Sequence, residues 1–325
     1  MTNILVTGGA GYIGSHIVEL LIKTRKKVYI VDNLSTGYKK LIHKKANFFL
    51  CDIKNLKKLN KIFKKNNISS VIHLAASLSV GESEKKPKKY YLNNVLGTKN
   101  VVKCCKENNV KNFIFSSTCA VYKDKMKLVK ENTKINPKST YGKTKMLGEN
   151  YLKKNLKKEK INFAILRYFN VAGASNTGKI GQISKGDQLF KNLSLASTKI
   201  LPKVNIYGNN YKTKDGTCVR DYIHVSDIAS IHLKVLNKIN REKKSTTLNC
   251  GYGKGVSVYE AINEFQKQTG KKFKLNIRGR RKGDMEEIIA DISKIKKFIN
   301  WRPKKNSIYH IVKSCLKWEK KIKLY

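Results

Sequence analysis

The stretch Asn3-Ile-Leu-Val-Thr-Gly8-Gly-Ala-Gly11-Tyr-Ile-Gly14 decides the fold of this chain. Its first five residues have the apolar character of a short buried strand, and an apolar helical pattern surrounds and follows the last glycine. Glycines at positions 8, 11 and 14 permit a tight turn, a close approach of the backbone to a pyrophosphate, and close packing of helix on strand. The stretch therefore predicts a phosphate-binding loop between a strand and the N-terminus of a helix.

A second apolar strand ends in an acidic residue, as a dinucleotide-binding unit requires. Residues 27–31 form this strand, and Asp32 follows it, 18 residues after Gly14. An acidic side chain at this place binds the ribose hydroxyls of NAD and repels the additional phosphate of NADP. The sequence thus predicts NAD as the cofactor. The alternative is a tight glycine turn that binds no ligand. The strand, the helix and the acidic residue all occur at the places that cofactor binding requires, and this disfavours the alternative.

A tyrosine and a lysine four residues apart form the candidate catalytic pair. Tyr141-Gly-Lys-Thr-Lys145 lies 23 residues after Thr118. On a helix the two side chains share a face, so we expect the Lys145 ammonium to lower the Tyr141 pKa from its usual ~10 toward neutrality. The ionised Tyr141 could then remove the proton of a substrate alcohol while a hydride leaves the carbon of that alcohol. The Thr118 hydroxyl could share a hydrogen bond with the same alcohol oxygen.

The Tyr-x-x-x-Lys spacing is not specific by itself. It occurs a second time at Tyr309 and Lys313, where a surface pair on a terminal helix is expected. The glycine loop at the other end of the chain distinguishes the first pair from the second.

Alternation of strand and helix patterns through the first 170 residues predicts an α/β fold with a doubly wound parallel sheet of Rossmann type. A smaller C-terminal α/β lobe is expected to bind the substrate. We predict an NAD-binding domain over 1–171 and a lobe over 172–325, with about 220–245 packing back on the first domain. Further strands are expected at 48–51, 70–74, 112–116 and 162–167, and helices at 55–66, 87–108, 141–158, 185–198, 226–240, 257–268 and 305–321.

The charge and cysteine content limit the possible partners and compartments. The net charge is +47, but only eight of the 69 basic residues are arginine, and the lysines are spread through nearly every segment. This pattern argues against specific nucleic-acid binding and predicts at most weak, salt-dependent attraction to polyanions. No apolar run is long enough to span a membrane. Seven cysteines without a Cys-x-x-Cys pair favour a reduced, cytoplasmic protein without structural metal.

The ordered motifs resemble those of the extended short-chain dehydrogenase/reductases and, within them, of the UDP-glucose 4-epimerase family. The resemblance extends over essentially the whole chain. Its more specific segments are Asp32-Asn-Leu-Ser35, His73-Leu-Ala-Ala76, Val80-Gly-Glu-Ser83, Arg167-Tyr-Phe-Asn170, Arg220-Asp-Tyr-Ile-His224 and Arg280-Arg-Lys-Gly-Asp284.

The resemblance implies interconversion of UDP-galactose and UDP-glucose through a 4-keto sugar, with tightly bound NAD, and possible action on the N-acetylated pair. It also implies a homodimer. The catalytic residues would be Thr118, Tyr141 and Lys145. The cofactor would be bound by Gly8, Gly11, Tyr12, Ile13, Gly14, Asp32, Asn33, Ser35, Thr36, Asp52, Ile53, Leu74, Ala75, Ala76, Asn94, Ser116, Tyr141, Lys145, Tyr168 and Phe169. The UDP-hexose would be bound by Thr118, Tyr141, Asn170, Gln188, Leu189, Asn205, Ile206, Tyr207, Arg220, Arg281, Asp284 and Ile288.

Ile288 matches the family position beside the sugar C2 substituent, where a tyrosine tends to exclude an N-acetyl group. Its smaller side chain predicts activity on N-acetylated substrates; packing between the lobes is the competing interpretation. His73 and His224 are expected to have hydrogen-bonding roles in the core.

Two other classes of function remain open. A related NAD-dependent nucleotide-sugar epimerase or dehydratase shares the scaffold, although dehydratases have an acidic pair where Cys119-Ala120 stands here. A non-catalytic NAD-binding or polyanion-binding protein would retain the loop but would not need the Thr118, Tyr141 and Lys145 set.

Overall fold

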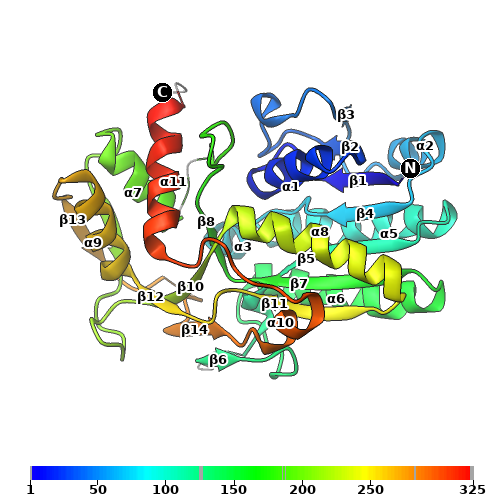
Figure 1. Ribbon diagram of the computed structural model, residues 1–325. Coiled ribbons are helices and arrows are strands. Elements are labelled where there is room, and N and C mark those ends of the chain that lie inside the picture. The colour runs from blue at the N-terminus through cyan, green and yellow to red at the C-terminus, as the bar shows by residue number, and fades with distance from the viewer. Residues whose placement is uncertain (1, 124–126, 185, 187, 282, 323–325) are drawn as a thin grey trace.

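A seven-stranded parallel sheet forms the larger part of the protein in the computed structural model (Figure 1). The structure describes residues 2–123, 127–184, 186, 188–281 and 283–322. The sheet order is β11-β7-β5-β4-β1-β2-β3, so the chain reverses its direction of progression between β1 and β4. Ligands of such sheets bind beyond the carboxyl ends of the strands at this reversal. The strands are β1 (Asn3–Thr7), β2 (Lys27–Asp32), β3 (Asn47–Leu50), β4 (Ser70–His73), β5 (Asn112–Thr118), β7 (Asn162–Tyr168) and β11 (Thr246–Cys250).

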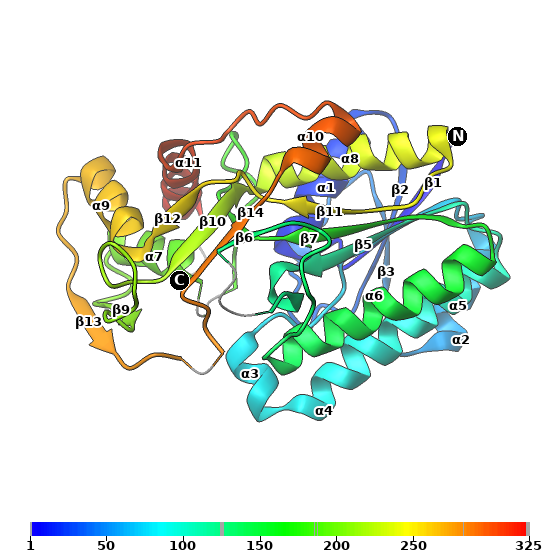
Figure 2. The same ribbon diagram turned by 90° about the horizontal axis from the view of Figure 1, so that it is seen from below.

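Helices cover both faces of this sheet (Figure 2). Successive side chains of a strand point to opposite faces, so Ile4 and Val6 pack toward α1 and α8, whereas Leu5 packs toward α2, α5 and α6. This arrangement confirms the doubly wound α/β fold. The helices are α1 (Tyr12–Lys23), α2 (Leu56–Lys65), α3 (Val80–Lys85), α4 (Pro87–Tyr90), α5 (Gly97–Glu107), α6 (Thr140–Lys158) and α8 (Val225–Glu242).

A smaller group of elements lies beside the carboxyl ends of the large sheet (Figure 1). Its sheet has the order β12-β10-β14-β6, with β8 paired to β10, and a separate pair joins β13 and β9. Helices α7, α9 and α11 pack together next to them. The elements are β6 (Leu128–Val129), β8 (Asn170–Ala172), β9 (Val204–Tyr207), β10 (Val219–His224), β12 (Gly255–Ser257), β13 (Leu275–Arg278), β14 (Glu287–Ala290), α7 (Leu189–Ser197), α9 (Val258–Thr269) and α11 (Ile308–Lys321). Helix α10 (Ser293–Ile299) follows β14 in the chain but packs against β11 and α8 of the larger part.

Segments on both sides of residue 171 cross between the two parts. Helix α8 packs against α1, and β11 adds the last strand to the large sheet beside β7. Conversely, β6 pairs with β14 in the smaller sheet. The chain thus passes repeatedly between the two parts.

The helix expected over residues 87–108 is interrupted. The π-helical turn η2 (Tyr91–Leu96) separates α4 from α5. The turn places Asn94 inward, where its side chain is buried. Because π turns add one residue to a helical turn, hydrophobic periodicity alone does not reveal them, although they are frequent at functional sites.

Candidate active site

The glycine loop brings the start of α1 close to β1 and to the segment after β4. Gly8 has φ +75°, and a Cβ there would lie 2.8 Å from the Ala75 nitrogen. A Cβ on Gly14 would lie 2.1 Å from the Gly8 carbonyl oxygen, so only glycine fits. Gly11 at the N-cap provides no side-chain cap, which leaves the N–H groups of the first turn, at Tyr12 and Ile13, suited to phosphate oxygens.

The carboxylate of Asp32 stands at the end of β2 beside this loop. It accepts hydrogen bonds from the backbone nitrogens of Ala10 (3.0 Å) and Leu34 (2.8 Å). Nearby, Asn33 donates to Asp52 (3.0 Å) and accepts from the Ser35 nitrogen (3.0 Å). The structure therefore brings the predicted cofactor-binding side chains of Asp32, Asn33 and Asp52 to neighbouring strand ends.

The segment after β4 continues the same path toward the reaction centre. Backbone nitrogens of Leu74 and Ala75 donate to the carbonyl and hydroxyl oxygens of Thr7. Asn94 accepts from the Ser77 nitrogen (2.8 Å) and donates to the Thr144 hydroxyl (3.1 Å). Asn94 thus ties this segment to α6, the helix of the candidate catalytic pair.

Three local features fit a bound NAD: the glycine cradle, the uncapped start of α1, and the acid at the end of β2. They converge at the carboxyl edge of the sheet, at the strand reversal. Of the remaining predicted cofactor residues, Thr36, Ile53, Ala76 and Phe169 follow the carboxyl ends of β2, β3, β4 and β7, and Ser116 lies within β5.

The candidate catalytic residues meet where β5 ends and α6 begins. Ser139 caps α6 by accepting from the Gly142 nitrogen (3.1 Å), and Tyr141 follows in the first turn. The hydroxyls of Tyr141 and Thr118 are hydrogen-bonded to each other. Lys145 is buried and donates to the Ser116 carbonyl (2.8 Å). The three residues expected from the sequence are therefore brought together.

The pKa values of this pair differ from the sequence-based expectation. Burial raises the pKa of Tyr141, and its hydrogen bond with Thr118 opposes that rise only in part. Burial lowers the pKa of Lys145 to about 7, against the effect of the nearby Glu149 carboxylate. The expected lowering of the Tyr141 pKa by Lys145 is thus wrong for this structure, because the ammonium group is itself desolvated and directed at a carbonyl.

The second Tyr-x-x-x-Lys pair lies on the surface of α11. Tyr309 is exposed, and the Lys313 ammonium lies 3.5 Å from its hydroxyl. This placement agrees with the interpretation of a surface pair.

Both histidines of the candidate motifs are hydrogen-bonded in the core. His73 pairs with the hydroxyls of Thr7 (2.6 Å) and Thr98 (2.9 Å). His224 accepts from the Ser226 nitrogen and pairs with the Ser314 hydroxyl (3.0 Å). Burial lowers the pKa of each to about 3, so each is neutral near pH 7.

Several of the predicted UDP-hexose residues lie on the loop before β14, on β9 and on β10. Arg281 pairs with Asp284 (2.9 Å), and its guanidinium lies over the Tyr207 ring, 4.4 Å from the centroid. Arg220 of β10 donates to the carbonyl oxygens of Val219 and Glu286. A planar guanidinium presents several donors at once, which suits a diphosphate.

This loop lies next to the candidate catalytic helix. A Cβ on Gly283 would lie 3.8 Å from Val80 of α3 and 4.0 Å from Ser139, the cap of α6. In Figure 2, the segment between β13 and β14 passes beside α3. The two expected sites therefore adjoin, although 140 residues separate them in the chain.

The other predicted substrate residues are more scattered. Ile288 is fully buried opposite Arg220 in the β10–β14 pairing and packs in a cluster with Phe169. Gln188 is exposed at the start of α7. The remaining positions are Asn170 on β8, Leu189 on α7, and Asn205 and Ile206 on β9.

Two aromatic residues expected near the cofactor direct their hydroxyls elsewhere. Tyr12 donates to the Gly173 carbonyl (2.6 Å). Tyr168 is hydrogen-bonded to His232 of α8 (2.6 Å). These contacts join the large sheet to the smaller part and to α8.

Sequence reasoning did not identify the role of the residues that hold α6 in place. The Tyr141 nitrogen donates to the buried Ser83 hydroxyl (3.1 Å) of α3. Arg167, which the sequence placed among the candidate site segments, is instead buried against Glu149 of α6. The helical periodicity of the sequence could have predicted only that the side chains of Ser83 and Glu149 face inward.

Comparison with known proteins supports the interpretation of the site as that of an NAD-dependent epimerase. Residues 4–251 match the model of the NAD dependent epimerase/dehydratase family. A UDP-glucose 4-epimerase of Lactobacillus helveticus is 38% identical over 319 residues, covering 98% of this chain and 97% of that protein.

Two solved structures illustrate the similarity in three dimensions. The UDP-glucose-4-epimerase of Stenotrophomonas maltophila, with bound NAD and formylated UDP-arabinopyranose, is 33% identical, with a TM-score of 0.94 and 98% of both chains covered. The UDP-Glc/GlcNAc 4-epimerase of Campylobacter jejuni is 38% identical, with a TM-score of 0.85, and 99% of this chain and 100% of that chain are covered. The chain therefore belongs to the NAD-dependent epimerase/dehydratase family.

Proposed function

We propose that this protein interconverts UDP-galactose and UDP-glucose with bound NAD. The observation that carries the proposal is the meeting of Tyr141, Thr118 and Lys145 at the carboxyl edge of the sheet that carries the glycine loop. Residues 1–171 form mainly the NAD-binding half, and residues 172–325 mainly the UDP-sugar half. The relatives named above, which span nearly the whole chain, support this assignment.

In the proposed reaction, Tyr141 removes the proton of the sugar 4-hydroxyl while the hydrogen on C4 leaves as hydride. Thr118 shares a hydrogen bond with the same oxygen. Bound NAD supplies a hydride acceptor whose nicotinamide ring carries a positive charge. Bound NAD would also supply the returning hydride, and Tyr141 would return the proton once the 4-keto sugar has turned its opposite face toward the cofactor. The sequence of steps gives no net oxidation.

The 4-keto sugar can turn its other face toward the cofactor only if the protein binds UDP strongly and the hexose weakly. Arg220 and Arg281 would hold the two phosphates, and Asp284 the uridine ribose. Interactions with the non-reacting part of a substrate can supply most of its binding energy. The residues Asn170, Gln188, Leu189, Asn205, Ile206 and Tyr207 would complete this anchor.

Incubation of purified protein with UDP-galactose, without added NAD, tests the function directly. Formation of UDP-glucose is expected. A protein that contains stoichiometric NAD but forms no UDP-glucose would contradict the proposal.

We further propose that the sugar pocket accepts the N-acetylated pair. Ile288 lacks the bulk and the hydroxyl of a tyrosine, and the similar Campylobacter jejuni protein is a UDP-Glc/GlcNAc 4-epimerase. Ile288 is fully buried in a cluster. Its size would therefore determine the shape of the wall of the sugar pocket.

We also propose that two copies associate through the η2–α6 face. Tyr91, Leu92 and Leu96 of η2 and Leu147 of α6 are exposed, and the two elements pack side by side. A pair of neighbouring helices can meet its symmetry copy in an isologous contact. Light scattering of the wild type and of Leu92→Asp should show a dimer and a monomer, respectively; a monomeric wild type would contradict the proposal.

The described residues contain no helix long and apolar enough to span a membrane. All seven cysteines are buried and unpaired with one another. Since free thiols persist in reducing compartments, we propose that the protein works in the cytoplasm.

A further inference from the structure

A buried ion pair lies directly behind the candidate catalytic residues. Glu149 of α6 is completely buried and accepts two hydrogen bonds from Arg167 of β7, at 2.9 and 2.6 Å. Burial raises the pKa of Glu149, but the hydrogen bonds and charge of Arg167 outweigh that effect and hold the pKa below its usual value. The carboxylate is therefore a fixed negative charge at neutral pH.

This charge is connected to the strand that carries Thr118. The Ser117 hydroxyl donates to the Glu149 carboxylate at 2.6 Å. Ser117 stands between Ser116, whose carbonyl holds the Lys145 ammonium, and Thr118, whose hydroxyl meets Tyr141. The position of Ser117 therefore sets the positions of both neighbours.

Glu149 also lies one helical turn beyond Lys145. Side chains four residues apart on a helix are neighbours, so Tyr141, Lys145 and Glu149 occupy successive turns of α6. Burial favours the neutral form of Lys145, and the carboxylate favours the charged form. The groups around this pair are Arg167, Ser117 and, at 3.6 Å from Glu149, Lys153; His73 faces Lys145 from β4.

We propose that Glu149 is a positioning residue for this reaction, holding β5 in place through Ser117 and keeping Lys145 in its charged form. The inference rests on the proposed roles of Tyr141 and Lys145. The electrostatic basis has two parts. A buried cation needs a nearby anion, and a charged Lys145 opposes, without reversing, the rise that burial causes in the pKa of Tyr141.

The other side of the ion pair extends to the smaller sheet. Arg167 also donates to the Tyr122 hydroxyl (3.0 Å) and to the Glu131 carbonyl (3.0 Å). Tyr122 in turn donates to Asn249 (2.5 Å), which donates to the carbonyl of Val129 in β6. Glu149 is thus held from the sheet side as well as from α6, which makes it a rigid element of the site.

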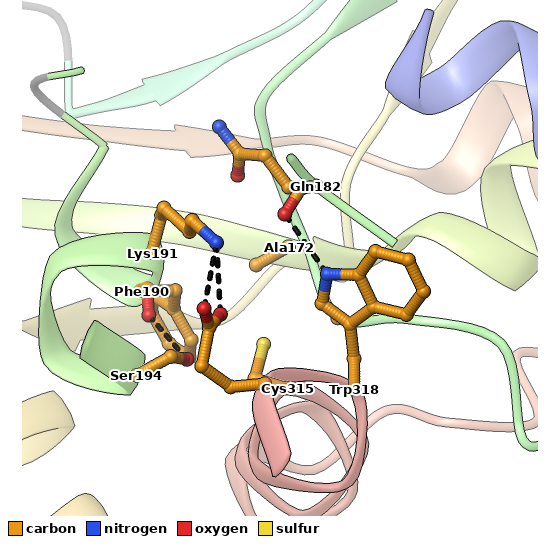
Figure 3. Close-up of a pocket in the computed structure, with 9 residues that line it drawn as sticks. Ala172, Gln182, Phe190, Lys191, Ser194, Cys315 and Trp318 are labelled. Atoms are coloured by element: carbon orange, nitrogen blue, oxygen red, sulfur yellow. Dashed lines mark hydrogen bonds and ion pairs between the residues drawn. The ribbon is translucent and has the colours of Figure 1, made fainter. Parts of the chain in front are cut away.

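The test compares Glu149→Gln with a matched control, Glu319→Gln. Glu319 of α11 forms a second buried ion pair, with Lys191 of α7 at 2.9 Å (Figure 3). That pair adjoins a cavity of ≈ 10 Å³, room for about one water molecule. The control therefore loses an equally buried carboxylate without touching α6.

The measurements are kcat and KM for UDP-galactose as functions of pH, together with the tyrosinate absorbance of the NAD-loaded enzyme. Without the Glu149 charge, Lys145 loses its proton at lower pH. We expect the alkaline limb of kcat to move down by about one pH unit, and the plateau to fall about tenfold or more, with KM little changed. Raising the pH should not restore the plateau, because it removes the same proton.

Glu149→Asp, which retains the charge, should keep the limb at its wild-type position, and Glu319→Gln should do so too. A Glu149→Gln limb at the wild-type pH would overturn the proposal even if stability fell. An equal shift in Glu319→Gln would also overturn it, since the effect would then come from general destabilisation.

Leaving Arg167 without its partner can prevent folding. In that case Glu149→Gln/Arg167→Met decides by the same criterion. The alkaline limb of the double variant should still move down. Glu149 lies one turn from Lys145 on α6, whereas Arg167 lies on β7, so removal of the Glu149 charge should dominate at Lys145.

Tyr141→Phe separates the two levels of the argument. If that variant remains fully active, the proposed catalytic roles fail. If it is inactive while the limb of Glu149→Gln is unshifted, only the role of Glu149 fails.

Discussion

The phenol of Tyr141 is half-buried and hydrogen-bonded, so removing its oxygen alone leaves the surrounding packing intact. We predict that Tyr141→Phe lowers kcat by about 10²–10⁴-fold, because the general acid–base group is lost. The steady-state rate with UDP-galactose measures this. Tyr309→Phe, at the exposed pair on α11, is the matched control and should retain wild-type turnover. A Tyr141→Phe enzyme with more than half of the wild-type rate would contradict the assignment.

The acidic residue at the end of β2 should determine the choice of cofactor. We predict that Asp32→Ala weakens the preference for NAD over NADP, since the ribose hydroxyls lose an acceptor and the repulsive charge disappears. Dissociation constants of both cofactors, compared between variant and wild type, measure the effect. Equal preference in the two proteins would show that Asp32 serves only to accept the backbone hydrogen bonds of Ala10 and Leu34.

The size of the side chain at position 288 should control substrate range. We predict that Ile288→Tyr loses turnover of the N-acetylated pair selectively, because the larger ring fills space beside the sugar C2 substituent. The ratio of kcat/KM for the two sugar pairs is the measurement. A wild type that does not turn over UDP-N-acetylglucosamine would overturn this argument, whereas the UDP-glucose activity would be unaffected.

At the scale of the element, the start of α6 positions Tyr141. Three side chains satisfy its first N–H groups: Glu84 binds the nitrogen of Thr140, Ser83 that of Tyr141, and Ser139 that of Gly142. Helix termini leave these donors without intrahelical partners. The tyrosine proposed as catalytic is thus held at its backbone by α3 as well as by its own helix.

We predict that Ser139→Ala lowers both stability and kcat. Loss of an N-cap costs about 1 kcal/mol, and here it also loosens the turn that carries Tyr141. Urea unfolding and steady-state kinetics measure the two effects. Ser307→Ala, which removes the cap of α11, should have a similar cost in stability with unchanged kcat. Equal kcat for both variants and wild type would show that the cap contributes stability alone.

At the scale of the whole molecule, four buried histidines link stability to pH. Burial lowers the pKa of His73 and His224 to about 3, and that of His16 and His232 to about 4. These values lie below the ordinary 6.5 of an unfolded chain. The stability that each contributes is therefore fully present above pH 6.5 and is lost as the pH falls toward the folded-state pKa.

We predict that the free energy of unfolding falls by about 1.4 kcal/mol per pH unit for each of these histidines between about pH 6.5 and 4. Urea denaturation at a series of pH values measures the slope. A His232→Gln variant should flatten it by about one quarter. A free energy of unfolding that does not change between pH 7 and 5 would contradict the prediction.

The sequence by itself determined the local pattern: the glycine loop, the acid after β2, the Tyr141–Lys145 spacing, and the alternation of strands and helices. Each is a short-range signal, because it depends on backbone geometry within one turn or one strand. The tertiary structure decided the rest. Only the folded chain shows that Gly283 lies beside Ser139, that Arg167 binds Glu149, and that Lys145 is directed at a carbonyl. Such contacts join residues far apart in the chain, and burial, which no local pattern measures, determines the charge state of each buried group.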